Sequence, residues 1–179
     1  MRISRYYAPR TEKRFSFLGY DRGRTLGGSF TARARGLLAA EFTLLNSNEE
    51  EFGRLRLRGV SDAEFVSGNS PTRFETSGRR YQMIADGKEV LITVPKGRSI
   101  GDLEIFCEGQ TYEAKISLFR TLAVAYAPGS ERVARLSGGL MGRSYETLFA
   151  TQDGCAFSVA IFLLWHVAAN RRRAYRRGG

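Results

Sequence analysis

Apolar and polar residues alternate with a period of two along most of the chain, from Phe15 to Thr151. In the segment GRLRLRG, Leu55 and Leu57 fall on one face of an extended strand, and the arginines between them fall on the other. Similar runs recur at intervals of about ten residues and are separated by Gly, Asn, Asp or Ser. They include GGSFTARARG, RRYQMIADG, KEVLITVPKG, DLEIFCEG, QTYEAKISLF, RTLAVAYAPG and SERVARLSG. This pattern predicts antiparallel β structure.

Turn residues between the runs support the same interpretation. Asp86-Gly87 predicts a type I′ hairpin, because both central positions of that turn need a positive φ, and Glu108-Gly109 and Pro128-Gly129 indicate further turns. The segment LLAAEFTLLNSNEEEF could also begin a helix, but we interpret it as a strand that ends at Asn46-Ser47-Asn48. The total of about twelve strands exceeds what one flat sheet holds comfortably and favours a closed or nearly closed barrel.

The C-terminal segment CAFSVAIFLLWHVAA, residues 155–169, breaks this pattern because it is apolar on every face and carries no charge. Such a helix must be buried in protein or in lipid. A helix over 154–170 is about 25 Å long, which is short against a hydrocarbon layer of about 30 Å but suits the interior of a barrel. Asp153 can cap its N-terminus, and Arg171, Arg172 and Arg173 complement its dipole. The expected core-facing helix residues are Phe157, Ile161, Leu164 and Trp165.

The predicted fold is therefore mainly β: a closed antiparallel barrel of about twelve strands around a single buried hydrophobic C-terminal helix. The expected organisation is a basic N-terminal arm at 1–13, a barrel domain at 14–170 with its helix at about 153–170, and an Arg-rich C-terminal tail at 171–179.

This arrangement resembles the tubby C-terminal-like superfamily, which includes tubby proteins, phospholipid scramblases and plant LURP-one-related proteins. The segments that carry the resemblance are EFTLLNSNEEEFGRLRLRG, RRYQMIADGKEVLITV and GRSYETLFATQDGCAFSVAIFLLWHVAAN, and it spans roughly residues 14–170. The resemblance implies a barrel closed around its last helix and, in some branches, phospholipid binding. Calcium is not expected, because no acidic calcium-loop-like segment follows the helix. No basic strand pair can be matched residue by residue to the tubby lipid site, so the resemblance itself supplies no lipid-binding residue.

Positive charge is concentrated at the two ends of the chain. Of the net charge of +10, residues 1–14 contribute +4 and residues 171–179 contribute +5, which leaves +1 for residues 15–170. We therefore expect a non-enzymatic binding or structural module that associates peripherally with anionic phospholipid. The expected lipid-binding residues are Arg2, Arg5, Arg10, Arg171, Arg172, Arg173, Arg176 and Arg177.

Other interpretations of the same features remain open at this point. The arms could be solvated tails, or they could bind nucleic acid. The protein could instead be tail-anchored, with residues 154–170 spanning the bilayer and Arg171 to Arg177 on the cytoplasmic side. A hydrolase whose Asp and Glu roles are not recognisable is a further alternative. The oligomeric state is left open.

Candidate catalytic chemistry is sparse, so no catalytic residue, metal site or cofactor is predicted. His166 is the one histidine, which leaves no His-based triad or multi-His metal site, and a structural role is favoured. Cys107 and Cys155 stand 48 positions apart and suggest neither a disulfide framework nor a zinc cluster, and Cys155 is expected to pack in the core. No apolar run follows the basic start of the chain, so we expect no secretory signal. We therefore expect a cytoplasmic location.

Overall fold

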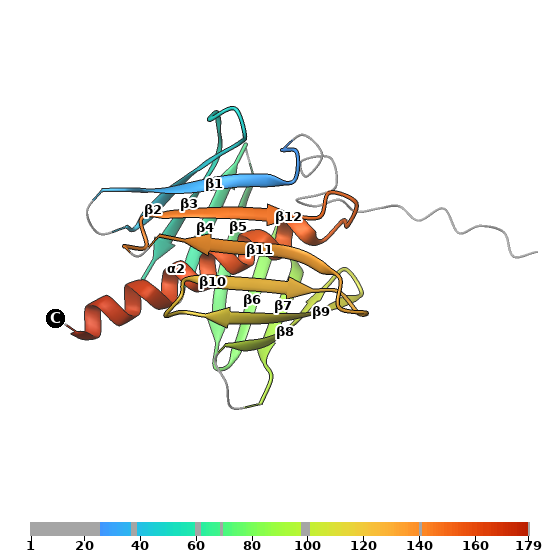
Figure 1. Cartoon of the computed structure of the whole chain (residues 1–179). Helices are drawn as coiled ribbons and strands as arrows, with labels where there is room; N and C mark the ends of the chain where they lie inside the picture. Colours follow the sequence, from blue (N-terminus) through green and yellow to red (C-terminus); the bar gives the residue numbers. More distant parts are fainter. Residues whose placement is uncertain are drawn as a thin grey trace, which may run out of the picture.

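The computed structural model describes residues 26–36, 39–59, 62–68, 70–97, 101–139 and 141–178, which form a closed barrel of twelve strands and one long C-terminal helix (Figure 1). Each strand pairs antiparallel with the next, and β1 pairs with β12 to close the barrel, so the prediction of a closed antiparallel barrel is confirmed. The strands are β1 (Ser29–Arg35), β2 (Glu41–Leu45), β3 (Glu51–Arg58), β4 (Asp62–Ser67), β5 (Ser70–Ser77), β6 (Arg80–Ala85), β7 (Lys88–Pro95), β8 (Asp102–Cys107), β9 (Gln110–Ser117), β10 (Leu122–Tyr126), β11 (Arg132–Gly138) and β12 (Ser144–Phe149).

The alternation in the sequence sets which side chains face the interior. Leu55 of β3 lies opposite Phe42 of β2 and Phe65 of β4, and all three side chains are buried. The ring of Phe65 fills the space beside Gly53, where a Cβ atom would lie 2.8 Å from the ring Cε2. The inward rows of neighbouring strands thus interlock, and Gly53 makes room for an aromatic ring.

The predicted turns occur where expected. Asp86 and Gly87 have φ values of 47° and 71°, and Glu108 and Gly109 have φ values of 48° and 81°, so each pair adopts the left-handed conformation of a two-residue hairpin. The predicted strand over LLAAEFTLL is shorter than expected. It begins only at Glu41, after Ala39 in a left-handed conformation with φ of 45°, and it ends at Leu45.

The helix, α2 (Ala156–Gly178), begins after a cap formed by Asp153. The Oδ1 atom of Asp153 accepts hydrogen bonds from the backbone N–H groups of Cys155 and Ala156, at 2.8 and 3.1 Å. The predicted end at Asn170 was wrong: α2 continues to Gly178, so residues 171–178 are helical and not a separate tail. Arginine favours helices, and its charge is favourable near a helix C-terminus.

All residues of α2 up to Ala168 are buried, and they occupy the inside of the barrel (Figure 1). Trp165 packs on Phe74 of β5 with ring centroids 4.9 Å apart. The ring centroid of Phe157 lies 6.1 Å from that of Phe30 of β1 and 6.4 Å from that of Phe65 of β4. Contacts on several sides explain why this helix is apolar all round. Within the described residues, no helix combines the length and the apolar character needed to cross a bilayer.

Candidate functional site

The connections between strands divide into two groups, one at each end of the barrel. Because successive strands run in opposite directions, the connections after β1, β3, β5, β7, β9 and β11 lie at the end where α2 finishes. The connections after β2, β4, β6, β8, β10 and β12 lie at the end where α2 begins. We call the first the arginine end and the second the acidic end, for the residues given next.

The acidic end carries charge of one sign. Its described connections contain six carboxylates and no Lys or Arg: Glu49, Glu50, Asp86, Glu108, Glu131 and Asp153. Burial raises the pKa of Glu108.

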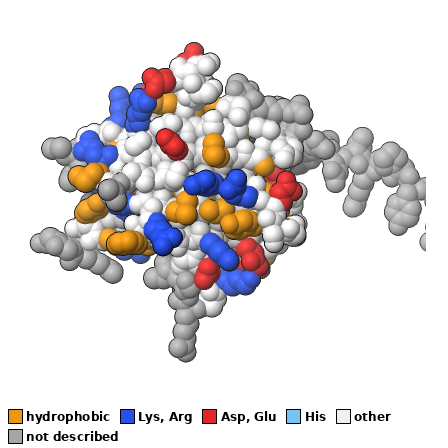
Figure 2. Space-filling model, viewed as in Figure 1, with side chains coloured by type: hydrophobic (Ala, Val, Ile, Leu, Met, Phe, Trp, Pro, Cys, Tyr) orange, Lys and Arg blue, Asp and Glu red, His pale blue; other side chains and the backbone are white. Residues whose placement is uncertain are grey.

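The arginine end carries the opposite sign, and its described connections include no Asp or Glu. Its connections contribute Arg79, Lys96, Arg120 and Arg143, and the last turns of α2 contribute Arg171, Arg172 and Arg173. The near-neutral sum over residues 15–170 therefore hides a separation of charge along the barrel axis. Figure 2 shows basic side chains beside hydrophobic ones on the left of the view, where α2 leaves the barrel in Figure 1.

Several guanidinium groups at the arginine end are held by backbone carbonyls. Arg172 donates to the carbonyl of Leu57 at 3.0 Å, and Arg143 donates to the carbonyl of Gly36 at 3.2 Å. These hydrogen bonds orient the two guanidinium groups. Lys96 is different, because it forms an ion pair of 2.6 Å with Glu113.

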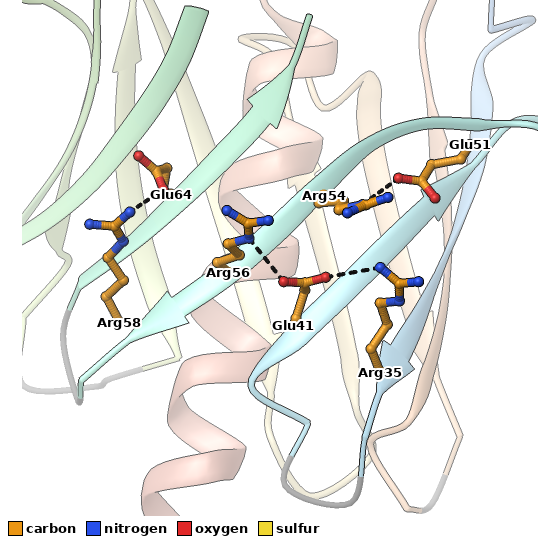
Figure 3. A network of polar contacts seen from close by, with 7 residues as sticks. All are labelled: Arg35, Glu41, Glu51, Arg54, Arg56, Arg58 and Glu64. Atoms are coloured by element: carbon orange, nitrogen blue, oxygen red, sulfur yellow. Dashed lines mark hydrogen bonds and ion pairs between the residues drawn. The ribbon is translucent and has the colours of Figure 1, made fainter.

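Several arginines on the outer wall of the barrel form ion pairs with neighbouring glutamates (Figure 3). Glu41 accepts hydrogen bonds from Arg56 at 2.9 Å and from Arg35 at 3.3 Å. Arg58 pairs with Glu64 at 2.5 Å, and Arg54 of the same strand pairs with Glu51. Burial acts to raise the pKa of Glu41, but the two arginines outweigh it and lower that pKa. On this part of the wall, positive charge is locally compensated.

A cavity of about 380 Å³ opens at the arginine end between α2 and two connections. Its charged and aromatic lining comes from β2, from the connection after β11, from β12 and from the last turns of α2, and consists of Phe42, Arg143, Tyr145, Arg171, Arg172 and Tyr175, with Met141 beside them. Three arginines and two tyrosines therefore face one concave surface.

Tyr145 forms the inner wall of this cavity. Its ring is buried and packs edge-on against Phe42, with centroids 5.6 Å apart. Burial raises the pKa of Tyr145 to about 12, although the nearby Arg171 opposes this shift, so the hydroxyl stays protonated. Gly142, in the left-handed conformation with φ of 62°, leaves space in the cavity beside Tyr145. A Cβ atom there would lie 3.2 Å from both the Tyr145 hydroxyl and Arg171 Nε.

A second polar cluster lies at the acidic end, under the start of α2. Tyr112 donates to the carboxylate of Asp153, with distances of 3.0 and 3.1 Å to its two oxygens, and this carboxylate also caps the helix. The thiol of Cys155 donates to the backbone carbonyl of Cys107 at 3.3 Å. A hydrogen bond with Cys155, together with burial, raises the pKa of Cys107. These groups tie the helix start to β8 and β9, and both thiols are buried.

The predicted functional residues fall into three groups. Arg171, Arg172 and Arg173 lie together where α2 leaves the barrel, whereas Arg176 and Arg177 belong to the helix and their side chains lie outside the described part. Arg2, Arg5 and Arg10 lie outside the described residues altogether. The predicted helix core residues are all in the barrel interior: Phe157, Ile161, Leu164 and Trp165.

Sequence reasoning missed the contribution of the connections, namely Arg79, Arg120 and Arg143, and that of Tyr145 on β12. The sequence did contain a signal for these residues, because alternate connections of an antiparallel barrel lie at the same end. Comparing the charge of alternate turns, instead of summing charge along the chain, would have separated Arg120 and Arg143 from Glu108 and Glu131.

Comparison with known proteins supports the fold. No protein-family model matches the sequence, and no curated protein matches it significantly. Among solved structures, the X-ray structure of the Arabidopsis thaliana protein AT5G01750 is similar, with a TM-score of 0.52 and 15% sequence identity. The match covers 76% of this chain and 88% of the Arabidopsis chain. At this identity the similarity establishes a shared fold.

Proposed function

We propose that the arginine end of the barrel binds the surface of membranes that contain anionic phospholipid. The observation that carries this proposal is the separation of charge, with basic residues at one end and carboxylates at the other. The negatively charged cytoplasmic leaflet would attract the arginine end and repel the acidic end. The barrel axis would therefore stand upright on the membrane.

The arrangement of the cations favours binding to an extended surface over binding to a small ligand. Arg79, Arg120 and Arg143 lie on three different connections, and Arg171 and Arg172 of α2 line the cavity at the same end. A basic residue close to an anionic bilayer contributes on the order of 1 kcal/mol. A flat, extended partner can contact several of these residues at once.

We also propose that the chain is a member of the tubby C-terminal-like superfamily. The closed twelve-stranded barrel, the apolar last helix inside it, and the fold shared with the Arabidopsis protein support this assignment. The binding site proposed above is argued from the charges of this chain alone.

Vesicle sedimentation tests the proposed function. We expect the protein to sediment with phosphatidylcholine vesicles that contain phosphatidylserine, but not with pure phosphatidylcholine. The double variant Arg120→Gln, Arg143→Gln should bind about 30-fold more weakly, because two contributions of about 1 kcal/mol are lost. The matched control is Arg132→Gln, Arg135→Gln, which removes the same charge from the outside of β11.

Two outcomes would count against the proposal. Equal loss of binding in the two double variants would mean that net charge alone matters, and not the arginine end. Binding to an oligonucleotide without any binding to vesicles would favour the nucleic-acid alternative, which should show a steep dependence on salt concentration.

A further inference from the structure

Three large hydrophobic side chains protrude from the arginine end. Phe119 is 95% exposed, Met141 is 73% exposed and Tyr175 is 63% exposed. Phe119 lies in the connection after β9, Met141 in the connection after β11, and Tyr175 on the last turns of α2. Of the five large hydrophobic residues that are exposed in the described part of the chain, these three are the most exposed.

The three side chains belong to one continuous rim. The connections after β9 and β11 are neighbours, since the backbone N–H of Gly138 donates to the carbonyl of Thr121 at 2.9 Å. Met141 and Tyr175 line the same cavity. The rim therefore runs from Phe119 across Met141 to Tyr175.

Charge and apolar surface alternate along this rim. Arg120 directly follows Phe119, and Arg143 comes two residues after Met141. The other two exposed hydrophobic residues, Phe106 and Leu148, lie instead on the wall, towards the acidic ends of β8 and β12. An exposed apolar side chain on a turn, next to an arginine, fits the boundary between lipid headgroups and acyl chains, where the apolar group can enter the hydrocarbon while the cation remains among the phosphates.

We infer that Phe119 and Met141 insert into the bilayer and anchor the arginine end to it. This inference rests on the proposed function and adds a hydrophobic component to an otherwise ionic attachment. The occupant is a lipid bilayer, because the exposed tips stand among cations at the end that an anionic surface attracts. Binding should therefore persist in part at salt concentrations that screen the arginines.

Tryptophan fluorescence provides a direct test with the full chain. The native Trp165 is buried against Phe74 and gives a constant background. A tryptophan introduced as Phe119→Trp should shift its emission to the blue with anionic vesicles, and lipids brominated on their acyl chains should quench it. The matched control Phe106→Trp should show neither effect.

The second arm of the test measures affinity. Phe119→Ala combined with Met141→Ala should bind anionic vesicles at least about tenfold more weakly at high salt, because two apolar side chains no longer leave water. Phe106→Ala combined with Leu148→Ala should bind like the unmodified protein.

The possible results separate the two proposals. If the unmodified protein sediments with anionic vesicles but Phe119→Trp is not quenched, insertion is wrong and ionic attachment stands. If the unmodified protein does not sediment with them at any salt concentration, both proposals are wrong. Quenching of Phe119→Trp and Phe106→Trp to the same extent would also overturn the inference, because the arginine end would then not be the inserted part.

Discussion

His166 makes the stability of the barrel sensitive to mild acid. Its ring is buried inside the barrel, 4.8 Å from the ring of Tyr81 and 5.7 Å from that of Phe162. Burial, with a smaller contribution from the charge of Arg173, lowers the pKa of His166 from 6.5 to about 4. The folded protein therefore holds a neutral imidazole at every pH above this value.

The sign and size of the effect follow from this difference in pKa. Between pH 6.5 and about 4, the unfolded chain binds a proton at His166 and the folded chain does not, so acid favours unfolding. The stability associated with the neutral ring is complete above pH 6.5 and is lost as the pH falls towards 4. The difference between the two pKa values corresponds to roughly 3 kcal/mol.

Urea unfolding at several pH values between 7 and 4 measures this loss. The variant His166→Phe removes the titrating group while keeping an aromatic ring, and it leaves all carboxylates in place. We expect the free energy of unfolding of the native protein to fall by roughly 3 kcal/mol more than that of the variant over this range. The comparison uses slopes against pH, so a constant effect of the substitution on packing cancels. Parallel slopes would refute the reasoning that His166 is kept neutral by burial.

Three further predictions concern packing and the second polar cluster. Asp153→Ala should lower the free energy of unfolding in urea by about 1–2 kcal/mol, because the helix cap is lost, and an unchanged midpoint would contradict the capping role. Gly138→Ala should lower the free energy of unfolding by about 1–3 kcal/mol, because the new Cβ would lie 2.5 Å from the nearest side-chain atom. The control Gly139→Ala, which has open space around it, should lower the free energy of unfolding much less. Equal effects of the two substitutions would rule out crowding at Gly138. The thiols of Cys107 and Cys155 should react with Ellman's reagent only after unfolding, and rapid reaction in native buffer would contradict their burial.

The barrel could be predicted from the sequence because its determinants are local and repeated. Leu55 and Leu57 show which face of β3 is buried, and Asp86-Gly87 specifies a hairpin by its need for positive φ. The apolar helix could be predicted for the same reason, because no face of it suits water. The end of the helix could not be predicted from the sequence. Arg171 and the residues after it have the charge of a solvated tail, and the same charge also favours a helix C-terminus.

The candidate site was harder to predict because its parts come from separate connections. Arg120 and Arg143 have little meaning in isolation, and the carboxylates at the other end cancel them in any sum along the chain. Cys107 and Cys155 show the same limit. Their contact depends on β8 ending and α2 beginning at one end of the barrel, and their spacing in sequence gives no sign of it.

The most direct test of the proposed orientation is hydrogen–deuterium exchange of the full chain with and without vesicles that contain phosphatidylserine. We predict slower exchange in residues 118–121 and 141–143 and in the last turns of α2 when vesicles are present. Exchange in residues 46–50 and 127–131 at the acidic end should be unchanged. Protection of the acidic end, or equal protection of both ends, would contradict binding through the arginine end.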